Sequence, residues 1–514
     1  MSREDILNSE RPSNYEDPHV PETTQKRLMV VGSSSYAGKS TLVTALCRIF
    51  SNMGIDVVPF KAQNMSLNSW VTDEGGEMGI AQAIQAWAAR LEPSVHMNPI
   101  LLKPKGNTIS QVIVHGKPYA DCEAGGFIRT REMLNCVIDS VRRLSNHELM
   151  LIEGVGGAAE INLYSRDIAN IMVARLLKPH LIIVGDIERG GVFASIYGTW
   201  KLLPEDVRNL VKGFVINKLR GDPKLLGNGP EMLEEMMGIP CLGVIPYTDI
   251  RIPSEDSVSL DDKKTRERCP IDVAVIRLPR ISNFTDFEPL EGLVNVRYVP
   301  LNSSLGEPDL IVLPGTKNTV GDLEELKKSG MAKQIVETYR KGTPVIGICG
   351  GYQMLGKQII DSRVEEKPGI YQGLGLLDIT TTFEKYEKTT VQTEKRVTGR
   401  GAILGRIKNE KVRGYEIHMG KTHTQKGTAE GGAFDDDGAE SQDGLVFGTY
   451  LHGLFDNECI RRALIEFLAE RKGLKIEINV DVQNTHYDPY EELAKLVSTH
   501  VDIDRILGWC GLNE

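Results

Sequence analysis

Short apolar runs rich in β-branched residues recur along this chain and alternate with stretches of helical periodicity. In the first half of the chain these runs lie at 27–32, 56–60, 149–153, 181–185 and 213–216. Buried strands of a parallel sheet show continuous apolar runs of this length, because helices cover both faces of such a sheet. The pattern therefore predicts an α/β domain in which a parallel sheet has helices on both faces.

The same alternation starts again beyond residue 270. Apolar runs at 271–277, 310–313 and 345–348 alternate with helical stretches such as 320–341, which predicts a second α/β sheet. The segment 253–268 between the two patterns is rich in charge and poor in apolar residues, as linkers are. We therefore expect a flexible N-terminal extension (1–26), a first domain (27–250), a linker (251–270), a second domain (271–470) and a C-terminal extension (471–514).

Composition narrows the class of protein. The 514 residues are 41% hydrophobic and 25% charged, as expected of two globular units in water. No apolar run approaches the roughly 18 residues of a membrane helix, and the start lacks a secretory signal, so we expect a cytoplasmic protein without a membrane partner. Eight cysteines without a C-x-x-C pair fit a reducing compartment. The net charge of −10 argues against nucleic acid as a partner and leaves open a homo-oligomer.

One cysteine stands where a chain can expose a nucleophile. Cys349 directly follows the apolar run 345–348, has Gly347 and Gly351 on either side, and precedes a helical stretch. A sharp strand-to-helix turn crowds the backbone, so glycines must flank the nucleophile, and the N–H groups that begin the helix stabilise a thiolate. A buried cysteine in a glycine-rich chain can show the same local pattern, so the segment alone leaves both interpretations open.

A cysteine nucleophile needs a base, and His452 is the best candidate among the ten histidines. It ends an apolar run at 447–451, which predicts a strand whose tip presents the imidazole. Cys/His pairs commonly meet only in the folded protein. The turn at Gly315 can offer one backbone N–H, and Gly350 a second, as an oxyanion hole. We therefore predict that Cys349 and His452 are catalytic.

The other end of the chain carries a phosphate-binding pattern. An apolar run leads into a loop that is bounded by glycines and closes on Gly-Lys-Ser before a helical stretch. Consecutive N–H groups of such a loop bind phosphates, the lysine neutralises their charge, and the serine hydroxyl of Ser40 can bind magnesium. The pattern predicts a site for ATP and Mg²⁺ formed by Gly32, Ser33, Tyr36, Ala37, Gly38, Lys39, Ser40 and Thr41.

Two further apolar runs end in charged residues that belong near this loop. Glu153 ends the run at 149–153, where an unpaired carboxylate would be costly and a magnesium ion would offset its charge. Lys61 follows the run at 56–60 and brings a cation near the expected phosphates. We predict that Glu153 is a metal ligand and that Lys61 contacts ATP.

The loop also resembles that of a known family. It has five residues between Gly32 and Gly38, whereas the standard phosphate-binding loop has four, and in this it is similar to dethiobiotin synthetase and its relatives. The resemblance implies that ATP activates a small carboxylated or aminated substrate. It also implies that Glu77 is a second acidic metal ligand and that Asn217 binds adenine, although Asn217 equally fits an asparagine that caps a strand end.

The cysteine turn, the Pro314-Gly315 turn and the histidine strand together resemble a class I glutamine amidotransferase domain. Such domains have a flavodoxin-like sheet and hydrolyse glutamine to ammonia. Most members have a glutamate two residues after the histidine, where this chain has Leu454. The chain resembles instead the Cys-His dyad branch found in cobalamin biosynthesis. Glu416 and His418 are candidates for orienting His452, with a packed strand as the alternative.

Longer segments resemble the cobyric acid synthase family, and they lie at 59–66, 97–104, 184–195 and 280–286. This resemblance implies amidation of the b, d, e and g carboxylates of adenosylcobyrinic acid a,c-diamide. Glutamine would supply the nitrogen, and ATP would form acyl phosphates. We expect Asp186, Arg189 and Asn64 at the acyl phosphate or the corrinoid substrate, with an ion pair inside the loop as the alternative for Asp186 and Arg189.

Three other classes share some of these features. A cobyrinate a,c-diamide synthase has the same parts, but the segments 61–64 and 283–286 favour the later enzyme of the pathway. A CTP-synthase-like enzyme would retain the glutamate that Leu454 replaces. A partitioning ATPase uses its nucleotide as a conformational switch. It would carry a lysine early in the loop, where 32–34 has none, and would not need Cys349.

Overall fold

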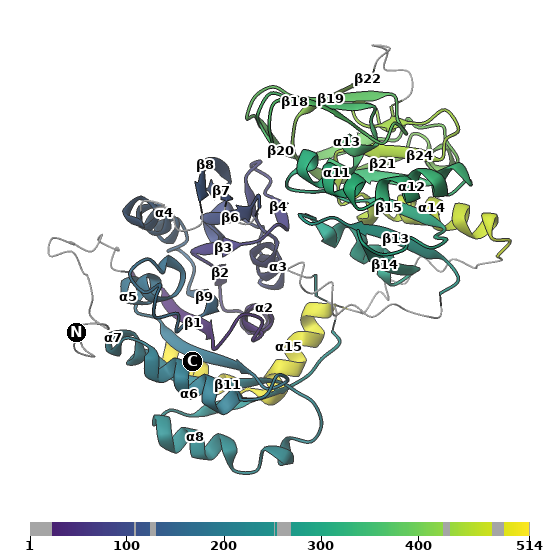
Figure 1. The fold of residues 1–514 in the computed structure, drawn as a ribbon. Helices are drawn as coiled ribbons and strands as arrows, with labels where there is room; N and C mark the ends of the chain where they lie inside the picture. Colours follow the sequence, from purple (N-terminus) through teal and green to yellow (C-terminus); the bar gives the residue numbers. More distant parts are fainter. Residues whose placement is uncertain are drawn as a thin grey trace.

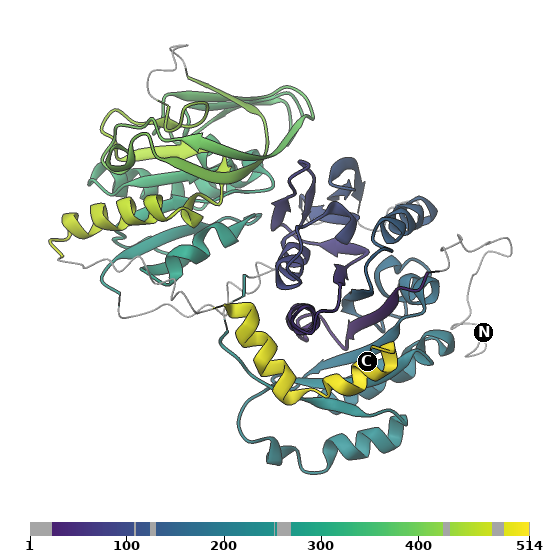
Figure 2. The same ribbon diagram turned by 180° about the vertical axis from the view of Figure 1, so that it is seen from behind.

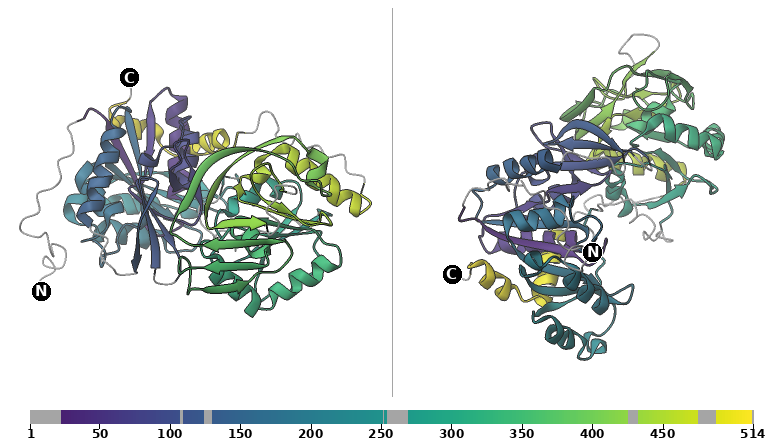
Figure 3. Two further views of the ribbon diagram at one scale, coloured as in Figure 1. Left: turned by 90° about the horizontal axis from the view of Figure 1, so that it is seen from above. Right: turned by 60° about the vertical axis from the view of Figure 1, so that its left-hand side comes forward.

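The computed structural model describes residues 23–106, 109–123, 130–250, 252–253, 269–424, 432–474 and 488–512. These residues form two lobes that meet along one side (Figures 1 and 3). Most of the predicted N-terminal extension and of the predicted linker lies outside the described residues. The two lobes correspond to the two predicted α/β domains.

A six-stranded parallel sheet forms the centre of the first domain. In spatial order its strands are β12 (Cys241–Pro246), β11 (Val211–Leu219), β10 (His180–Asp186), β1 (Lys26–Gly32), β9 (Leu149–Gly157) and β2 (Val57–Phe60). Along β1, Met29 and Val31 pack on one face, while Leu28 and Val30 pack on the other. Both faces are therefore buried, as predicted. The helices of this domain include α2 (Lys39–Asn52), α3 (Ile80–Ala88), α4 (Thr130–Arg143), α5 (Val173–Leu177), α6 (Val192–Leu202), α7 (Glu205–Arg208) and α8 (Gly229–Met237).

Two short sheets extend the first domain toward the second (Figure 1). One contains β3 (Gln63–Met65), β6 (Ile100–Pro104), β7 (Ile109–Val114) and β8 (Lys117–Glu123) in that order. The other is a hairpin of β4 (Ser69–Val71) and β5 (Glu77–Gly79). On this hairpin the Trp70 ring packs edge-on against Tyr415 of the second domain, with ring centroids 4.9 Å apart. The hairpin is thus part of the contact between the domains.

The second domain also has a central six-stranded sheet. In spatial order its strands are β14 (Asn295–Pro300), β13 (Asp272–Arg277), β15 (Leu310–Leu313), β16 (Val345–Ile348), β24 (Val446–Thr449) and β23 (Ala439–Glu440). All neighbours are parallel except β23 and β24. The helices include α10 (Glu288–Glu291), α11 (Thr319–Lys328), α12 (Met331–Arg340), α13 (Gly350–Leu355) and α14 (Glu458–Arg471). The predicted strands at 271–277, 310–313 and 345–348 are confirmed.

Two smaller sheets lie beside this central sheet. One has the order β18 (Gly369–Gln372), β17 (Gln358–Asp361), β19 (Ile379–Phe383) and β22 (Lys421–Thr424). The other has the order β20 (Lys388–Arg396), β21 (Lys411–Met419) and β25 (Leu451–His452). The chain therefore leaves the central sheet after β24, and β25 places His452 opposite Tyr415 of β21.

The predicted helix at 320–341 was wrong in its length, because the structure has two helices there. They are α11 and α12, and Gly330 lies between them with φ 83°. A left-handed residue ends a right-handed helix, and glycine adopts it without the clash that a side chain brings. The buried residues Leu326 and Met331 on the two sides of the break continue the apolar pattern, which made two helices look like one.

The end of the chain returns to the first domain (Figure 2). Helices α15 (Pro489–His500) and α16 (Ile503–Cys510) pack against it, and Leu493 and Val497 share a hydrophobic cluster with Leu42 of α2. Val501 also forms a β-bridge with Gly243 of β12. Residues 488–512 of the predicted C-terminal extension are therefore part of the first domain.

We expect the substitution Leu493→Ala to destabilise the first domain by about 2–5 kcal/mol, because the side chain is fully buried and its loss leaves a cavity. The midpoint of urea unfolding of the first domain measures this change. Lys495→Ala on the exposed side of the same helix is the control and should leave the unfolding midpoint unchanged. Equal midpoints for the two variants would show that α15 does not contribute to this core.

None of the helices in the described ranges combines the length and the apolar character needed to cross a bilayer. All eight cysteines are described, and each has a free thiol. Cys349 is one of the buried ones. Packing and hydrogen bonds, without disulfides, hold the described part of this fold together.

Candidate active site

The strand-to-helix turn at Cys349 has the geometry of a nucleophile elbow, and its buried thiol lines a cavity. Cys349 joins β16 to α13 with φ 51° and ψ −109°, a strained conformation for a residue with a side chain. A Cβ on Gly351 would lie 2.0 Å from the carbonyl oxygen of Leu313, and one on Gly347 would lie 2.8 Å from the Cα of Tyr352. Both flanking positions therefore require glycine, which confirms the physical reason given for the sequence pattern.

The structure brings Cys349 and His452 together at one cavity. Both line it, together with Ser282, Thr316 and Gln353. His452 is almost completely buried. A Cβ added to Gly315 would lie 3.0 Å from Cε1 of the His452 ring, so the predicted oxyanion loop lies directly against the imidazole. Gly350 begins α13 immediately after the nucleophile.

A buried aspartate orients His452. Asp286 Oδ2 lies 2.7 Å from His452 Nδ1, and Asp286 Oδ1 accepts a hydrogen bond from the N–H of Gly453. Because Asp286 holds Nδ1, the other ring nitrogen Nε2 is left for Cys349. Sequence reasoning missed this residue, although the segment 283–286 had already been recognised as a family segment.

The two residues predicted as helpers of His452 have other partners. Glu416 forms an ion pair with Lys395 at 2.8 Å and another with His418 at 3.4 Å. Against the effect of burial, these contacts lower the pKa of Glu416 to about 2. The His418 ring stacks on Tyr450, with centroids 3.7 Å apart. Glu416 therefore ties β21 to β20 through Lys395. In the structure Asp286, rather than Glu416 or His418, contacts His452.

The charge of Asp286 decides the protonation state of His452. Burial alone would lower the pKa of His452, but the Asp286 carboxylate and the interaction with Cys349 outweigh it and raise the pKa to about 10. His452 is then an imidazolium at neutral pH. A protonated His452 beside Cys349 can give its proton to a leaving group.

We expect Asp286→Asn to lower glutamine hydrolysis by roughly 10²- to 10⁴-fold and to shift its pH profile. With Asp286 present, His452 loses its proton only as pH rises through about 10. The amide of asparagine removes the charge that raises this pKa, so the alkaline limb of kcat/KM moves to lower pH. A pH profile of the residual hydrolysis measures the shift, and an unmoved alkaline limb would contradict this role of Asp286.

Aromatic rings link the first domain to the catalytic histidine. The Tyr415 ring stacks on His452, with centroids 5.4 Å apart and planes 18° apart. Trp70 of the first domain packs edge-on against Tyr415, and Trp87 of α3 packs edge-on against Trp70. The position of His452 therefore depends on side chains of both domains.

The predicted phosphate-binding loop lies between β1 and α2. Gly38 has φ 97°, and a Cβ there would lie 1.9 Å from Nδ2 of Asn217. A Cβ on Gly32 would lie 2.8 Å from Nζ of Lys39. The loop thus passes so close to its neighbours that only glycine fits at either end, while Asn217 donates to the carbonyl oxygen of Ala37 at 3.0 Å. Asn217 thus holds the loop from β11, which β10 separates from β1 in the sheet.

Charged groups gather around Glu153 in the middle of β9. Glu153 is fully buried, and its Oε1 lies 2.8 Å from Ser40 Oγ and 2.8 Å from Lys61 Nζ. Its other oxygen accepts a hydrogen bond from Gln85 of α3. Lys39 donates to the carbonyl oxygen of Gly156 at 2.8 Å. The structure thus brings together four predicted residues from three separate segments, namely Lys39, Ser40, Lys61 and Glu153.

A large cavity of about 710 Å³ opens above this loop. Most of the predicted nucleotide and substrate residues line it: Tyr36, Gly38, Lys39, Ser40, Thr41, Lys61, Asn64, Glu153, Arg189 and Asn217. Ser33 does not line it, and its N–H donates to the carbonyl oxygen of Val184 in β10. The cavity has the size of a small-molecule binding site.

Gly32, Ser33 and Ala37 do not line this cavity, and neither do the predicted acidic residues Asp186 and Glu77. Asp186 pairs with Lys218 at 2.9 Å and accepts from the N–H of Glu188, so it holds the loop after β10. Glu77 lies on the hairpin between the domains, with one oxygen 2.5 Å from Lys103 and the other paired with Lys388. Glu77 does not line the large cavity, so its role as a second metal ligand stays a prediction that rests on the family resemblance alone.

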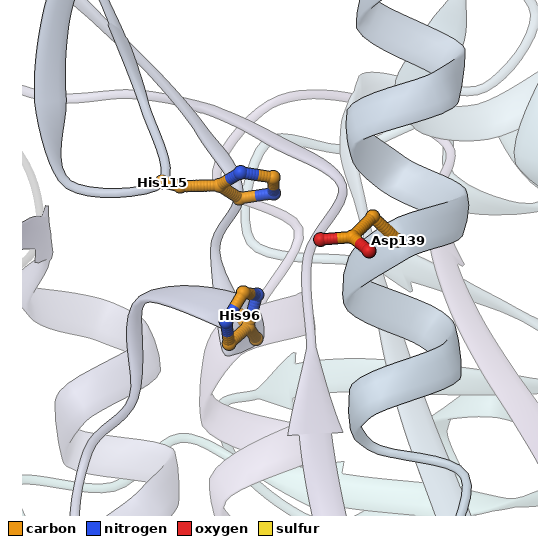
Figure 4. A group of neighbouring side chains, drawn as sticks. All are labelled: His96, His115 and Asp139. Atoms are coloured by element: carbon orange, nitrogen blue, oxygen red, sulfur yellow. The ribbon is translucent and has the colours of Figure 1, made fainter.

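A third polar cluster lies apart from both cavities (Figure 4). It contains His96, His115 of the turn between β7 and β8, and Asp139 of α4. The hydroxyl of Ser140 lies 3.0 Å from His96 Nδ1 and 3.0 Å from His115 Nε2, and Asp139 accepts from Arg143. The cluster therefore ties two loops to α4 through hydrogen bonds.

Comparisons with known proteins agree with this division of the chain. Residues 28–259 match the family model described as CobQ/CobB/MinD/ParA nucleotide binding domain. Residues 272–459 match the one described as CobB/CobQ-like glutamine amidotransferase domain. The first match covers the residues that line the large cavity except Phe284, and the second covers Cys349, His452 and Asp286.

Similar proteins extend over almost the whole chain. A probable cobyric acid synthase of Methanosarcina mazei is 55% identical over 494 residues, which cover 95% of this chain and all of the relative. One of Methanococcoides burtonii is 55% identical over 493 residues, covering 95% and 98%. Among solved structures, PurLQS from Thermotoga maritima is similar over 39% of this chain and 99% of its own, with 17% identity and a TM-score of 0.28. The identity and coverage of the two relatives establish that this chain belongs to the cobyric acid synthase family.

Proposed function

We propose that the protein amidates the b, d, e and g carboxylates of adenosylcobyrinic acid a,c-diamide, with glutamine as nitrogen donor and ATP as activator. The observation that carries this proposal is the pairing of two cavities in one chain. One contains Cys349, His452 and the oxyanion loop, and the other contains the phosphate-binding loop. A glutaminase site joined to an ATP site is the combination that an amidoligase needs. The first site forms ammonia, the second forms an acyl phosphate, and the two must react with each other away from water.

In the first half-reaction the Cys349 thiolate attacks the amide carbon of glutamine. The N–H groups of Gly315 and Gly350 stabilise the oxyanion. The His452 imidazolium gives its proton to the departing nitrogen, which leaves as ammonia, and a thioester forms on Cys349. Neutral His452 then takes a proton from the water that attacks the thioester, and glutamate leaves. Asp286 holds His452 in the required tautomer throughout.

In the second half-reaction a corrinoid carboxylate attacks the γ-phosphorus of ATP, ADP leaves, and an acyl phosphate forms. Lys39 and Lys61 supply positive charge near the phosphates. Ammonia then attacks the acyl carbon and expels phosphate, which yields the amide. Asn64 and Arg189 line the same cavity and are our candidates for contacts with the corrinoid.

Mg²⁺ fits the residues beside the loop. Ser40 Oγ and Glu153 offer oxygen ligands, and Gln85 Oε1 beside them is buried without a hydrogen-bond partner in the described structure. Hard oxygen donors are the ligands Mg²⁺ prefers. When bound, the ion would neutralise phosphate charge and orient the γ-phosphate.

A thin wall separates the two cavities. Lys103 and Asn283 line the Cys349 cavity, while the next residues, Pro104 and Phe284, line the large cavity. Ser69 joins the two sides, because its N–H donates to Asn283 Oδ1 at 3.2 Å and its hydroxyl accepts from Lys103 at 2.9 Å. We infer that ammonia crosses between the cavities at Ser69.

We expect Ser69→Val to uncouple the two half-reactions, because it adds bulk to this wall and removes its hydroxyl. The ratio of glutamate formed to amide formed should rise about tenfold, equivalent to ~1.4 kcal/mol in favour of escape. Amidation from added ammonia should persist, and Ser69→Ala, which adds no bulk, is the matched control. An unchanged ratio in Ser69→Val would place the crossing elsewhere.

The substrate assignment is tested by offering two corrinoids with ATP, Mg²⁺ and glutamine. Mass spectrometry should show four added amides on the a,c-diamide and little reaction of cobyrinic acid itself. Two amides added to cobyrinic acid would support the a,c-diamide synthase alternative. ATP hydrolysis without amidation of either corrinoid would favour a nucleotide switch.

A further inference from the structure

Three lysines from both domains border the glutaminase cavity. Lys103 comes from β6 of the first domain, Lys388 begins β20 of the second, and Lys317 follows the oxyanion turn. Glu365, which follows β17, lines the same cavity. The glutaminase mechanism uses none of these four side chains.

The lysines outnumber the carboxylates that neutralise them. Glu77 alone pairs with both Lys103 and Lys388, whose side chains are almost fully buried. Lys317 has only a neutral partner, Gln111 Oε1 at 2.6 Å, and no carboxylate within ion-pair distance in the described parts of the chain. Positive charge without a matching anion is costly in a site of low dielectric. An anion bound here would remove that cost.

The protonation equilibria of the cavity agree with this imbalance. Burial, and then the neighbouring charges of Lys388 and Lys103, hold the pKa of Lys317 well below its ordinary value. Burial also raises the pKa of Glu365 to about 7, while one of its oxygens accepts from the N–H of Val320 at 3.1 Å. An incoming carboxylate would favour charged Lys317, and an incoming ammonium would favour charged Glu365.

We propose that Lys317 and Lys388 bind the α-carboxylate of glutamine and that Glu365 binds its α-ammonium group. The inference rests on the proposed glutaminase activity and deepens it, since it names what makes the cavity specific for an amino acid. The free volume beside Cys349 is about 40 Å³, which is less than glutamine needs. Lys317 therefore exchanges Gln111 for the carboxylate as the substrate enters, while Lys388 keeps its ion pair with Glu77.

The same arrangement gives Glu77 a role as a positioning residue. It comes from the first domain, and its ion pair with Lys388 holds that amino group at the cavity. The glutamine site is therefore completed by the first domain. This arrangement would limit glutamine hydrolysis to protein in which the two domains are in contact, because the first domain completes the glutamine site.

Two glutamine analogues test the inference in the full-length protein. 4-Aminobutanamide lacks the α-carboxylate, and 4-carbamoylbutanoic acid lacks the α-amino group. Lys317→Met should lower kcat/KM for glutamine by roughly 10- to 150-fold and leave hydrolysis of 4-aminobutanamide within about twofold, because only glutamine loses a charge-assisted contact. Glu365→Gln should lower glutamine hydrolysis and spare 4-carbamoylbutanoic acid. Lys328→Met on the exposed surface is the control.

The ratio between substrates separates recognition from a folding defect. An equal loss for glutamine and for 4-aminobutanamide in Lys317→Met, or no loss for either, would overturn the inference. Amidation of the corrinoid from added ammonia, measured in the same variants, should remain at the wild-type rate. Failure of that reaction in the wild-type protein would contradict the proposed synthase function, while the substrate ratios still decide the glutamine subsite.

Discussion

Replacement of Cys349 by alanine should abolish amidation from glutamine and leave amidation from added ammonia intact. The substitution removes the nucleophile, so glutamine hydrolysis should fall by at least ~10⁴-fold. Cys349 does not line the cavity of the phosphate-binding loop, so the protein should still amidate the corrinoid from ATP and added ammonia. Parallel assays of glutamate, ADP and amide, each with glutamine or ammonium as the nitrogen source, measure both reactions.

Cys459→Ala is the matched control for this experiment. Cys459 is a free thiol at the start of α14 and does not line the cavity. It should retain both reactions. Glutamine-dependent amidation that survives in Cys349→Ala would show that another residue is the nucleophile. The strained turn at Cys349 would then have only a structural role.

Lys39→Met should have the opposite pattern, with loss of amidation from either nitrogen source. Lys39 is the cation of the phosphate-binding loop, and its Nζ donates to the carbonyl oxygens of Ser34 in the loop and of Gly156 in β9. Phosphoryl transfer depends on positioned positive charge, so we expect a loss of about 10³-fold or more. Basal glutamine hydrolysis at Cys349 should remain detectable, because that chemistry needs no nucleotide.

The exposed Lys117 on β8 provides the control, and Lys117→Met should keep both reactions. Filter binding of ATP distinguishes lost affinity from lost chemistry in Lys39→Met. Normal ammonia-dependent amidation in that variant would contradict the assignment of the loop as the catalytic nucleotide site.

The sequence predicted the parts of this protein that depend on local pattern. The long apolar runs marked the central strands of both sheets, because a strand covered on both faces is apolar throughout. The glycines around Cys349 and at Gly32 and Gly38 revealed two tight turns, because no side chain fits there. Local crowding is visible in a sequence, and both turns lie where the pattern placed them.

Features that depend on contacts between distant segments were not predictable in this way. Asp286 lies 166 residues from His452 in the chain, and nothing in its local pattern distinguishes it from a surface aspartate. The family resemblance implied that Glu77 is a metal ligand, but in the structure it forms ion pairs with Lys103 and Lys388. Only the folded structure shows which cation pairs with a buried carboxylate.

Short strands escaped prediction for a related reason. Strands β3, β4 and β5 have three residues each, which is too short for alternation to stand out. Yet the β4–β5 hairpin carries Ser69, Trp70 and Glu77, three of the residues that join the domains. The helices at the C-terminus were likewise unplaced, because amphipathic periodicity shows that a helix packs but not against which domain.

The central claim is that one chain carries nitrogen from glutamine to corrinoid carboxylates without releasing it. Its most direct test is a competition with amide-¹⁵N glutamine, ATP, Mg²⁺, the a,c-diamide and an excess of unlabelled ammonium, followed by mass spectrometry of the product. We predict four new amides that carry ¹⁵N, because ammonia made at Cys349 reaches the acyl phosphate inside the protein. Amides that carry mainly unlabelled nitrogen, or a corrinoid without new amides, would contradict the account.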